Sequence, residues 1–262
     1  MLMEIQKKLQ EHPWVGQIHW FDEIDSTNTR AKEMALAGAP HGTVLIADHQ
    51  TGGRGRLGRS FQSPGGVGVY MSILLRPNCA MDQLMHLTCA TAVASCDAVE
   101  HSTGLRPGIK WTNDLVHEKR KLAGILTELV IVGNQVCAVV GIGINCCQGP
   151  DDFSEDIRGF AGSLAMSTGK TVDRASVAAC LIDAIFRMDE GLISGKTAMM
   201  EQYRRDCITI GQDVSLLRGD EVRHGHALSV DDDGALVVRF GDDSVEHVQS
   251  GEISVRGMYG YL

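Results

Sequence analysis

Two long apolar runs separated by a turn dipeptide constrain the fold more than any other feature of this sequence. Leu122–Val132 and Gln135–Ile144 are both rich in aliphatic and β-branched residues, and Gly133-Asn134 lies between them. Gly and Asn adopt the positive φ angles that tight hairpin turns require, and β-branched residues favour strands. We therefore expect the two runs to form a β-hairpin.

The rest of the first two thirds of the chain alternates strand and helix patterns. Four residues suited to capping a helix, Asp25–Asn28, precede an apolar helical face that stops at Gly38. The segment at 151–167 is polar and irregular and is expected to be a loop. Further strands are predicted at Ile18–Phe21, Thr43–Gln50, Val67–Leu75, Ile109–Trp111 and Asp114–Val116, and further helices at Gln83–Val99, Arg174–Ile193 and Ala198–Cys207.

The pattern changes after Cys207. The segments VSLL, ALSV, ALVVRF and ISVRG are short β-type runs with turn residues between them, and Asp233-Gly234 is a strong turn dipeptide. About 50 residues is within the ordinary lower range for a domain. The sequence therefore predicts two domains, a larger one over residues 1–208 and a small all-β one over residues 209–262.

Composition narrows the classes of protein and the compartment. The chain has 262 residues, and 33 acidic against 24 basic residues give a net charge of −9, which disfavours nucleic acid as a main partner. No apolar run is long enough to cross a bilayer, and the N-terminus lacks the hydrophobic segment of a signal peptide. The eight cysteines form no C-x-x-C pair, so we expect buried thiols and a cytoplasmic protein without a metal site.

Two other patterns resemble metal sites only weakly. His224 and His226 have no further ligands near them, and Asp231–Gly234 is not followed by the acidic residue that a calcium loop needs at its twelfth position. A surface strand and a hairpin turn explain these two patterns.

A glycine–arginine loop follows the Thr43–Gln50 strand. It reads Gly52-Gly53-Arg54-Gly55-Arg56-Leu57-Gly58-Arg59. Glycines allow backbone N–H groups to approach a ligand, and arginines give charge-assisted hydrogen bonds to carboxylate or phosphate. The loop is neither a P-loop nor a dinucleotide fingerprint. A solvated basic loop is the alternative, but three arginines in an acidic chain favour an anion site.

Three later segments carry polar residues or glycines at strand positions. Lys110, next to the Asn113-Asp114 turn, either binds an anion or is an exposed lysine. Gly124 either admits a ligand or lets two strands pack closely. Asn145, at the end of Gly141-Ile142-Gly143-Ile144, either bonds a nucleotide or caps a turn. From these residues alone the alternatives stay open.

Together the motifs resemble those of a known family. Ser26-Thr27-Asn28, Gln50 with GRGRLGR, KWTNDL, KLAGILTEL, GIGIN and GEISVR occur in the order and approximate spacing seen in bacterial biotin–protein ligases. The resemblance covers essentially the whole chain, and GRGRxGR with KW-x-NDL is a specific pair. The chain departs from the family at Thr112, where proline is usual, and at Leu57, where a basic residue is frequent.

The resemblance implies an α+β fold. A mixed β-sheet catalytic domain with helices on one side, like that of class II synthetases and lipoate ligases, would precede a small SH3-like β-barrel. It also implies a biotin–[acetyl-CoA-carboxylase] ligase, which activates biotin with ATP to biotinyl-5′-AMP and transfers it to one lysine of the biotin carboxyl carrier protein. Mg²⁺ would accompany ATP as substrate, and no tightly bound prosthetic group is expected.

The resemblance also implies roles for particular residues. Lys110 and Arg56 would be catalytic. Biotin would be bound by Ser26, Thr27, Asn28, Gln50, Gly53, Arg54, Arg56, Lys110, Gly124 and Gly141, and the nucleotide by Arg56, Arg59, Lys110, Asn113, Asn145 and Arg256.

Other functions remain as alternatives. A lipoate or octanoate ligase or transferase of related fold would bind a flexible apolar chain instead of a ureido ring. A non-catalytic sensor would bind biotinyl-AMP and DNA, but only about 17 residues precede the first predicted strand, too few for the winged helix that some relatives carry. We therefore expect no DNA partner and no membrane partner, and a homodimer is left open.

Overall fold

A computed structural model describes residues 1–219, 221–249 and 254–257. The larger part is built on a seven-stranded sheet in the order β1-β2-β3-β7-β6-β5-β4. β1 and β2 run parallel, and every other neighbouring pair in this sheet is antiparallel. The strands are β1 (Ile18–Ile24), β2 (Thr43–Gln50), β3 (Gly68–Leu75), β4 (Gly108–Lys110), β5 (Asp114–His117), β6 (Arg120–Val132) and β7 (Gln135–Asn145).

The predicted hairpin is confirmed as β6 and β7. The two strands pair from Ala123 opposite Ile144 to Val132 opposite Gln135, and Gly133 in the turn has φ 60°. β7 also pairs with β3 and β6 with β5, so the hairpin lies within the sheet. Val140 and Ile144 of β7 join the large core, whereas Leu129 and Ile131 near the hairpin turn are exposed.

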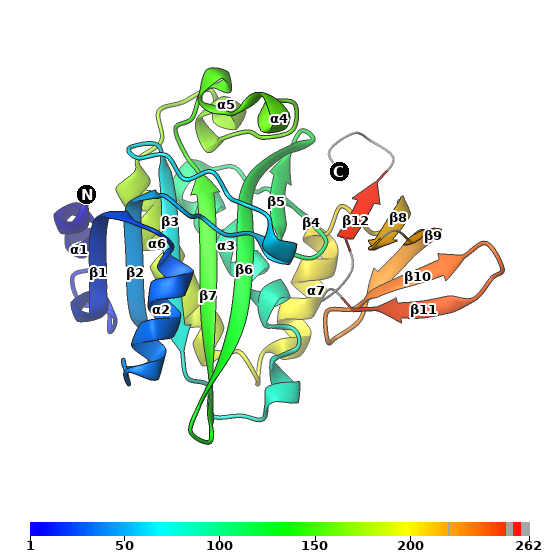
Figure 1. Cartoon of the computed structure of the whole chain (residues 1–262), viewed down its shortest axis with the longest axis horizontal. Helices are drawn as coiled ribbons and strands as arrows, with labels where there is room; N and C mark the ends of the chain where they lie inside the picture. Colours follow the sequence, from blue (N-terminus) through cyan, green and yellow to red (C-terminus); the bar gives the residue numbers. More distant parts are fainter. Residues whose placement is uncertain (220, 250–253, 258–262) are drawn as a thin grey trace.

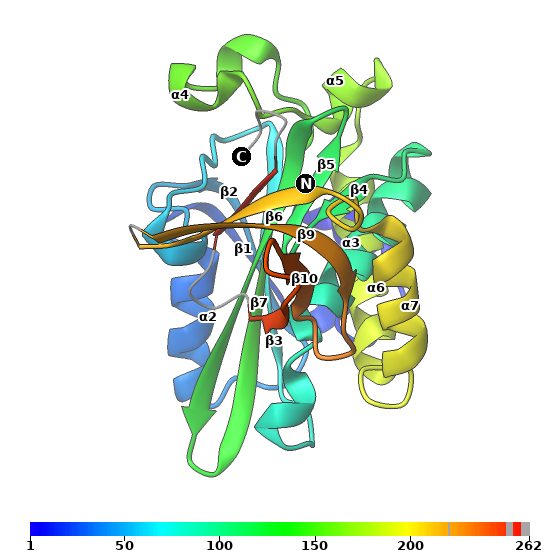
Figure 2. The same cartoon turned by 90° about the vertical axis from the view of Figure 1, so that its right-hand side faces the viewer.

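Helices cover the sheet unevenly. α1 (Leu2–Lys8), α3 (Leu87–Thr103), α6 (Arg174–Glu190) and α7 (Lys196–Asp206) lie on one face, whereas α2 (Thr27–Leu36) lies on the other (Figures 1 and 2). In β2, Val44 and Ile46 join the large core on the first face, and Leu45 packs with Ala31 and Ala35 of α2. The predicted α+β class is confirmed, and the face that bears α2 is left open for a site beside that helix.

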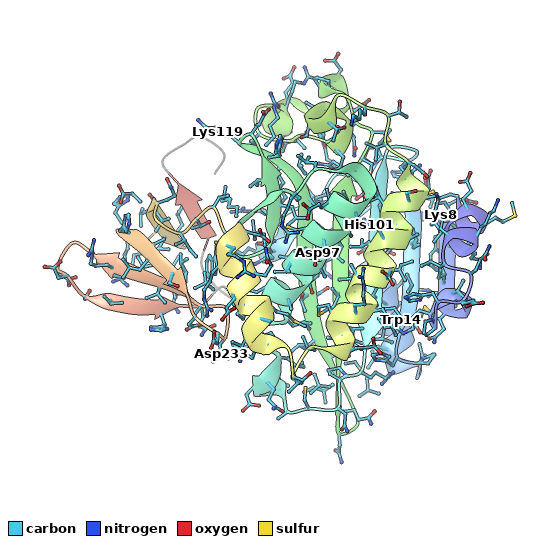
Figure 3. The ribbon with its side chains drawn as sticks, turned by 180° about the vertical axis from the view of Figure 1, so that it is seen from behind. Lys8, Trp14, Asp97, His101, Lys119 and Asp233 are labelled. Carbon is cyan, nitrogen blue, oxygen red and sulfur yellow. The ribbon has the colours of Figure 1, made fainter. Side chains whose placement is uncertain are left out.

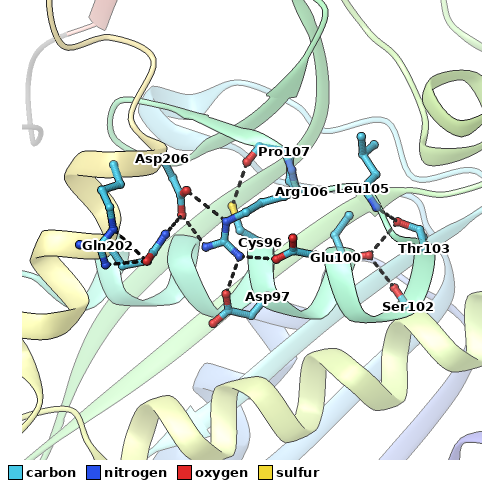
Figure 4. Close-up of polar contacts among 12 residues, drawn as sticks. Cys96, Asp97, Glu100, Ser102, Thr103, Leu105, Arg106, Pro107, Gln202 and Asp206 are labelled. Atoms are coloured by element: carbon cyan, nitrogen blue, oxygen red, sulfur yellow. Dashed lines mark hydrogen bonds and ion pairs between the residues drawn. The ribbon is translucent and has the colours of Figure 1, made fainter.

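An ion-pair cluster holds α3 against α7 (Figure 4). Arg106 bonds Asp206 at 2.6 Å, Asp97 at 2.8 Å and Glu100 at 2.7 Å. The hydrogen bonds to Asp206 raise the pKa of Arg106 above its ordinary value, so the charge of this side chain is secure. The cluster fixes the end of α7, from which the chain continues into the second sheet.

Two segments contain helices that the sequence analysis did not predict. The N-terminus forms α1, because Ile5 is fully buried and α1 packs against α6. The 151–167 segment contains α4 (Glu155–Arg158) and α5 (Leu164–Thr168), with Leu164 fully buried. Both cases are short helices formed by tertiary contacts, which periodicity over so few residues does not predict. Short 3₁₀ turns occupy Val15–Gln17, Arg56–Gly58, Met81–Leu84 and Pro150–Asp152.

The C-terminal part is a five-stranded sheet in the order β11-β10-β9-β8-β12. Asp231 Oδ1 accepts from the Asp233 and Ala235 N–H groups, so the aspartate-rich segment is the predicted hairpin turn. Its strands are β8 (Asp213–Arg218), β9 (Glu221–Val230), β10 (Leu236–Phe240), β11 (Val245–Val248) and β12 (Ser254–Gly257).

The turn between β9 and β10 packs on α7 and on the first sheet. Arg204 Nε donates to Val230 O at 2.6 Å, and Lys196 Nζ lies 2.6 Å from Asp233 Oδ1. Figure 3 shows Asp233 at this junction. Trp111 Nε1 donates to Gly234 O at 3.0 Å, so the second sheet contacts the residue next to Lys110.

Candidate functional site

A cavity of about 510 Å³ lies on the face of the sheet that bears α2. Three structures surround it: the N-terminus of α2, the β6–β7 hairpin, and the glycine–arginine loop, which crosses in front of the sheet in Figure 1. Its apolar lining residues are Leu57, Phe61, Met71, Trp111, Ile125, Leu126, Ile142, Phe153, Ile157, Phe160 and Ala161.

One end of the cavity is polar and is formed where β2 meets α2. Ser26 caps α2, and its Oγ lies 3.5 Å from Thr29 N. Gln50 Oε1 accepts from Thr27 N at 2.8 Å and lies 3.1 Å from Thr27 Oγ1, while Gln50 Nε2 donates to Ser63 Oγ at 2.9 Å. Gln50 therefore has a fixed amide orientation, with its oxygen toward α2.

A second layer of polar side chains lies behind Thr27. Ser72 Oγ is 2.7 Å from Thr27 Oγ1 and 2.6 Å from Asn28 Oδ1. Asn28 Nδ2 donates to Leu126 O at 3.1 Å and to Glu128 Oε2 at 2.9 Å. A Cβ at Gly141 would lie 2.0 Å from Asn28 Oδ1, so only glycine leaves room for this amide.

The glycine–arginine loop forms a narrow flap, residues 50–63. Gln50 pairs with Ser63 and Arg54 with Ser60 in antiparallel bridges, and the turn at Leu57 has φ 56°. A Cβ at Gly53 would lie 2.3 Å from Phe61 O. Glycine is therefore required at 53 for the two sides of the flap to approach each other.

Phe61 of the flap lies on the hairpin. A Cβ at Gly143 would meet the Phe61 ring at 2.5 Å, and one at Gly124 would lie 3.4 Å from it. The two glycines thus let the ring lie against the strands. The flap closes one side of the cavity by this contact.

Cationic side chains gather where the flap faces the β4–β5 turn. Arg56 Nη1 donates to Asn113 Oδ1 at 3.0 Å, and Asn113 Nδ2 donates to Ile125 O at 2.9 Å. Burial lowers the pKa of Arg56 below its ordinary value. Arginine stays protonated even so, and a partly desolvated guanidinium interacts more strongly with an anion. Lys110 lies opposite Asp114 in the strand pair and also lines the cavity.

The far end of the cavity is closed by the segment at 148–163. Asn145 Nδ2 donates to Gly162 O at 2.9 Å, and Gln148 Nε2 lies 3.3 Å from Asn145 Oδ1. Lys121 N donates to Phe160 O at 2.7 Å, and Ser154 N donates to Gln62 Oε1 at 3.3 Å. The segment is therefore bonded both to β6 and to the flap.

The structure brings nearly all the sequence-predicted site residues to this one cavity. Gly53 is not among the lining residues and supports the flap instead. The side chain of Arg256 lies outside the described residues, although its backbone is in β12. The predicted residues that line the cavity are Ser26, Thr27, Asn28, Gln50, Arg54, Arg56, Arg59, Lys110, Asn113, Gly124, Gly141 and Asn145.

Sequence reasoning missed several residues of the site. Phe61 was missed because the arginines of its loop were the only residues there with an evident chemical role. The ion pair of Lys121 with Asp114, at 2.6 Å, was missed because the two residues belong to segments that were interpreted separately. Ser72 carried a usable signal, because it is a lone hydroxyl in the apolar strand VYMSILL. A fully buried polar group needs a hydrogen-bond partner. Asn28 is the partner of Ser72, and Asn28 is in turn bonded to Glu128.

Within residues 1–219, 221–249 and 254–257, no group of three or more His, Cys, Asp or Glu side chains could hold a metal ion. Among the helices that the structure describes, none is long and apolar enough to cross a membrane.

The arrangement suits a long ligand with three different parts. The polar end can accept and donate hydrogen bonds to a small ring, and the apolar walls of Phe61, Leu126 and Ile142 can cover a hydrocarbon chain. The cations at the flap and at Lys110 can neutralise a carboxylate and phosphates that meet there.

Comparison with known protein families gives two matches. Residues 20–145 match the Biotin/lipoate A/B protein ligase family, and residues 209–256 match the Biotin protein ligase C terminal domain. The two matched regions fall on the two sheets.

Individual proteins are similar over most of the chain. The bifunctional ligase/repressor BirA of Bacillus subtilis is 33% identical over 96% of this chain and 78% of its own length. The biotin–[acetyl-CoA-carboxylase] ligase of Mycobacterium tuberculosis is 32% identical over 88% of this chain and 86% of its own. The structure of a biotin protein ligase from Aquifex aeolicus in complex with biotin and ATP superposes with a TM-score of 0.79 at 30% identity, covering 92% of this chain and 99% of that one.

Proposed function

The chain belongs to the biotin protein ligase family, and on that premise we propose that its central cavity joins biotin and ATP as biotinyl-5′-AMP. The protein is an ATP-dependent biotin–[acetyl-CoA-carboxylase] ligase. The proposal concerns which residues perform the reaction. The observation that carries it is the gathering of a polar end, apolar walls and flap cations in one cavity of about 510 Å³.

The polar end supports biotin over lipoate as the substrate. A ureido ring carries two N–H donors and a carbonyl acceptor, and Thr27, Gln50 and Ser26 offer matching groups. The dithiolane ring of lipoate has no N–H group, so it would make fewer hydrogen bonds with these groups, and each missing bond would cost about 0.5–1.5 kcal/mol. The C-terminal match to biotin protein ligases favours the same substrate.

In the first half-reaction the biotin carboxylate attacks the α-phosphorus of ATP, and pyrophosphate leaves. Two anions must approach each other, so neutralising their charge lowers the barrier. Arg56 and Lys110 are the cations assigned to this task, and Arg54 and Arg59 lie on the same flap. Asn113 bonds Arg56 at 3.0 Å and thus holds the flap toward the nucleotide. Asn145 would contact the nucleotide from the other side.

Magnesium would enter with the nucleotide. Mg²⁺ is commonly held by substrate phosphates and one or two carboxylates, without an all-protein cage. The cavity fits that pattern, since Asp114 and Asp156 line it. When bound, Mg²⁺ would neutralise phosphate charge beside Lys110 and Arg56.

In the second half-reaction the amine of the carrier's lysine attacks the acyl carbon, and AMP leaves. We propose the biotin carboxyl carrier protein of acetyl-CoA carboxylase as the acceptor, because relatives are named for that reaction. Positioning of the two reactants would supply much of the rate.

Three wider proposals accompany this function. We propose domains at 1–208 and 209–262, which fits the junction of the two sheets after α7. The cytoplasm is the proposed compartment, because all eight cysteines are free thiols and disulfides are rare there. A homodimer remains a proposal without a contact to support it.

Mass spectrometry of single incubations tests the function. The protein with biotin and MgATP should give biotinyl-5′-AMP, and added carrier domain should gain one biotin mass. Lipoate in place of biotin should give no adenylate. Adenylation of lipoate with none of biotin would overturn the proposal, and the protein without ATP is the control.

A further inference from the structure

A chain of buried hydrogen bonds runs from an ion pair at the surface to the polar end of the cavity. It contains Lys32, Glu128, Asn28, Ser72 and Thr27 in that order. Of these, Thr27 and Asn28 line the cavity of the proposed function, on which this inference rests. The first four residues decide how the hydroxyl of Thr27 is oriented.

The Asn28 amide has one allowed orientation. Its Nδ2 lies 2.9 Å from a Glu128 carboxylate oxygen and 3.1 Å from the Leu126 carbonyl, and both of these groups can only accept. The NH₂ group must therefore face them. The other amide atom, Oδ1, is consequently directed at Ser72, where it also can only accept.

The orientation of the Asn28 amide determines the direction of the hydrogen bond between Ser72 and Thr27, because each hydroxyl has one proton. Ser72 Oγ is 2.6 Å from Asn28 Oδ1 and 2.7 Å from Thr27 Oγ1, and a hydroxyl has one proton. Because Asn28 Oδ1 needs that proton, the second short contact is a hydrogen bond only when Thr27 supplies its own. The contact of Thr27 Oγ1 with Gln50 Oε1, at 3.1 Å, is the longer competitor.

The consequence is an acceptor in the cavity. Once the Thr27 proton is directed at Ser72, the Oγ1 lone pairs are left for a ligand. Gln50 Oε1 beside it is also an acceptor, since it takes the Thr27 N–H at 2.8 Å. Two neighbouring acceptors favour a ring that brings N–H donors.

The start of the chain is held by charge. Lys32 Nζ lies 2.8 Å from Glu128 Oε1, and both side chains are about three quarters buried, with exposures of 27% and 23%. Burial opposes ionisation of Glu128, but the hydrogen bonds from Lys32 and Asn28 outweigh it, and the pKa of Glu128 is lowered. Glu128 therefore stays an obligatory acceptor at neutral pH.

We propose that Glu128 is a positioning residue, which fixes the Thr27 hydroxyl as a hydrogen-bond acceptor through Asn28 and Ser72 and so makes the cavity selective for a ring with N–H donors. Glu128 itself lies one layer behind the ligand. Nothing in the reaction needs its proton or its charge directly.

Glu128→Gln is the informative variant. Lys32 would hold the new carbonyl oxygen, so the new NH₂ group would face the NH₂ group of Asn28, and only the Leu126 carbonyl would still favour the parental orientation of that amide. When the amide turns around, Ser72 donates to Thr27, and Thr27 presents a proton to the ligand. We expect the Kd and KM for biotin to rise about tenfold, as loss of about 1.4 kcal/mol gives, while the KM for ATP stays within twofold.

Two further measurements distinguish orientation from general damage. Biotin methylated on a ureido nitrogen should bind the parental enzyme much more weakly than biotin does, and Glu128→Gln should shrink that difference. Asn28→Asp combined with Glu128→Gln restores an acceptor toward Ser72 and a donor toward position 28, but its second oxygen meets the Leu126 carbonyl, so it should regain part of the biotin affinity. Glu33→Gln, which removes an exposed carboxylate from α2, the helix that carries Asn28 and Lys32, is the charge control.

Calorimetry with biotin alone and pyrophosphate release with ATP provide the readouts on the full chain. If the parental enzyme makes no biotinyl-AMP, the proposed function fails. If it does, but Glu128→Gln binds biotin within twofold of the parental enzyme, the positioning role is refuted. The role is also refuted if the double variant binds biotin as weakly as Glu128→Gln does. The same holds if Glu128→Gln is unfolded and the double variant binds biotin weakly.

Discussion

At the residue scale, the function depends on a few cations brought near each other by separate segments. Lys110 comes from the end of β4 and Arg56 from the flap, 54 positions earlier in the chain. Each has an ordinary surface interpretation when taken alone. The shared cavity is what gives them a common task, because two anionic substrates need opposite charge at the same point.

Lys110→Ala should lower the rate of biotinyl-AMP formation about a hundredfold, as loss of one electrostatic group at a developing charge commonly does. Stability should change little, since the side chain is only partly buried. Pyrophosphate release and thermal unfolding measure the two effects. Lys7→Ala, which removes an exposed lysine of α1, is the matched control. An adenylation rate equal to that of Lys7→Ala would remove Lys110 from the catalytic assignment.

At the element scale, the flap is the element that single substitutions should affect most. Its two sides are joined by the Arg54–Ser60 bridge, and Phe61 anchors it on the β6–β7 hairpin at Gly143. Beyond that anchor, Arg56 holds the tip through Asn113. Arg56 thus adds a side-chain contact at the tip, whereas the base is held by backbone pairing.

Arg56→Gly should let the adenylate escape, so that bystander proteins added to the reaction become biotinylated. Arg56→Lys should give an intermediate result, because lysine keeps the charge but loses the planar fork that bonds Asn113. Streptavidin blots of an added bystander such as serum albumin measure the leak. Equal blots from parental enzyme and both variants would contradict the clamp.

At the scale of the whole molecule, the second sheet supports the first. Arg204 bonds the Val230 carbonyl and pairs with Asp232, and the same turn accepts a hydrogen bond from Trp111, the neighbour of Lys110. The turn between β9 and β10 therefore contacts the strand that carries a catalytic cation. None of the residues that line the cavity comes from the second sheet in its described part.

Arg204→Ala should lower the free energy of unfolding by about 1 kcal/mol, the usual worth of a partly exposed charged hydrogen bond. It should also raise amide exchange in β9 and β10 with a small effect on the KM for biotin. Chemical denaturation and hydrogen exchange test this, with Arg205→Ala as the exposed control. Similar exchange in both variants would mean that Arg204 does not hold the sheet.

The sequence by itself determined the local elements and the chemical inventory. The β6–β7 hairpin, the strand at Thr43–Gln50 and the cap of α2 follow from propensity, periodicity and turn chemistry, which act over a few residues. Tertiary structure alone decided the contacts between distant segments. Ser72, Asn28 and Glu128 form one network, and α1 and α5 each bury an aliphatic side chain, because burial and proton counting act only after the chain is folded.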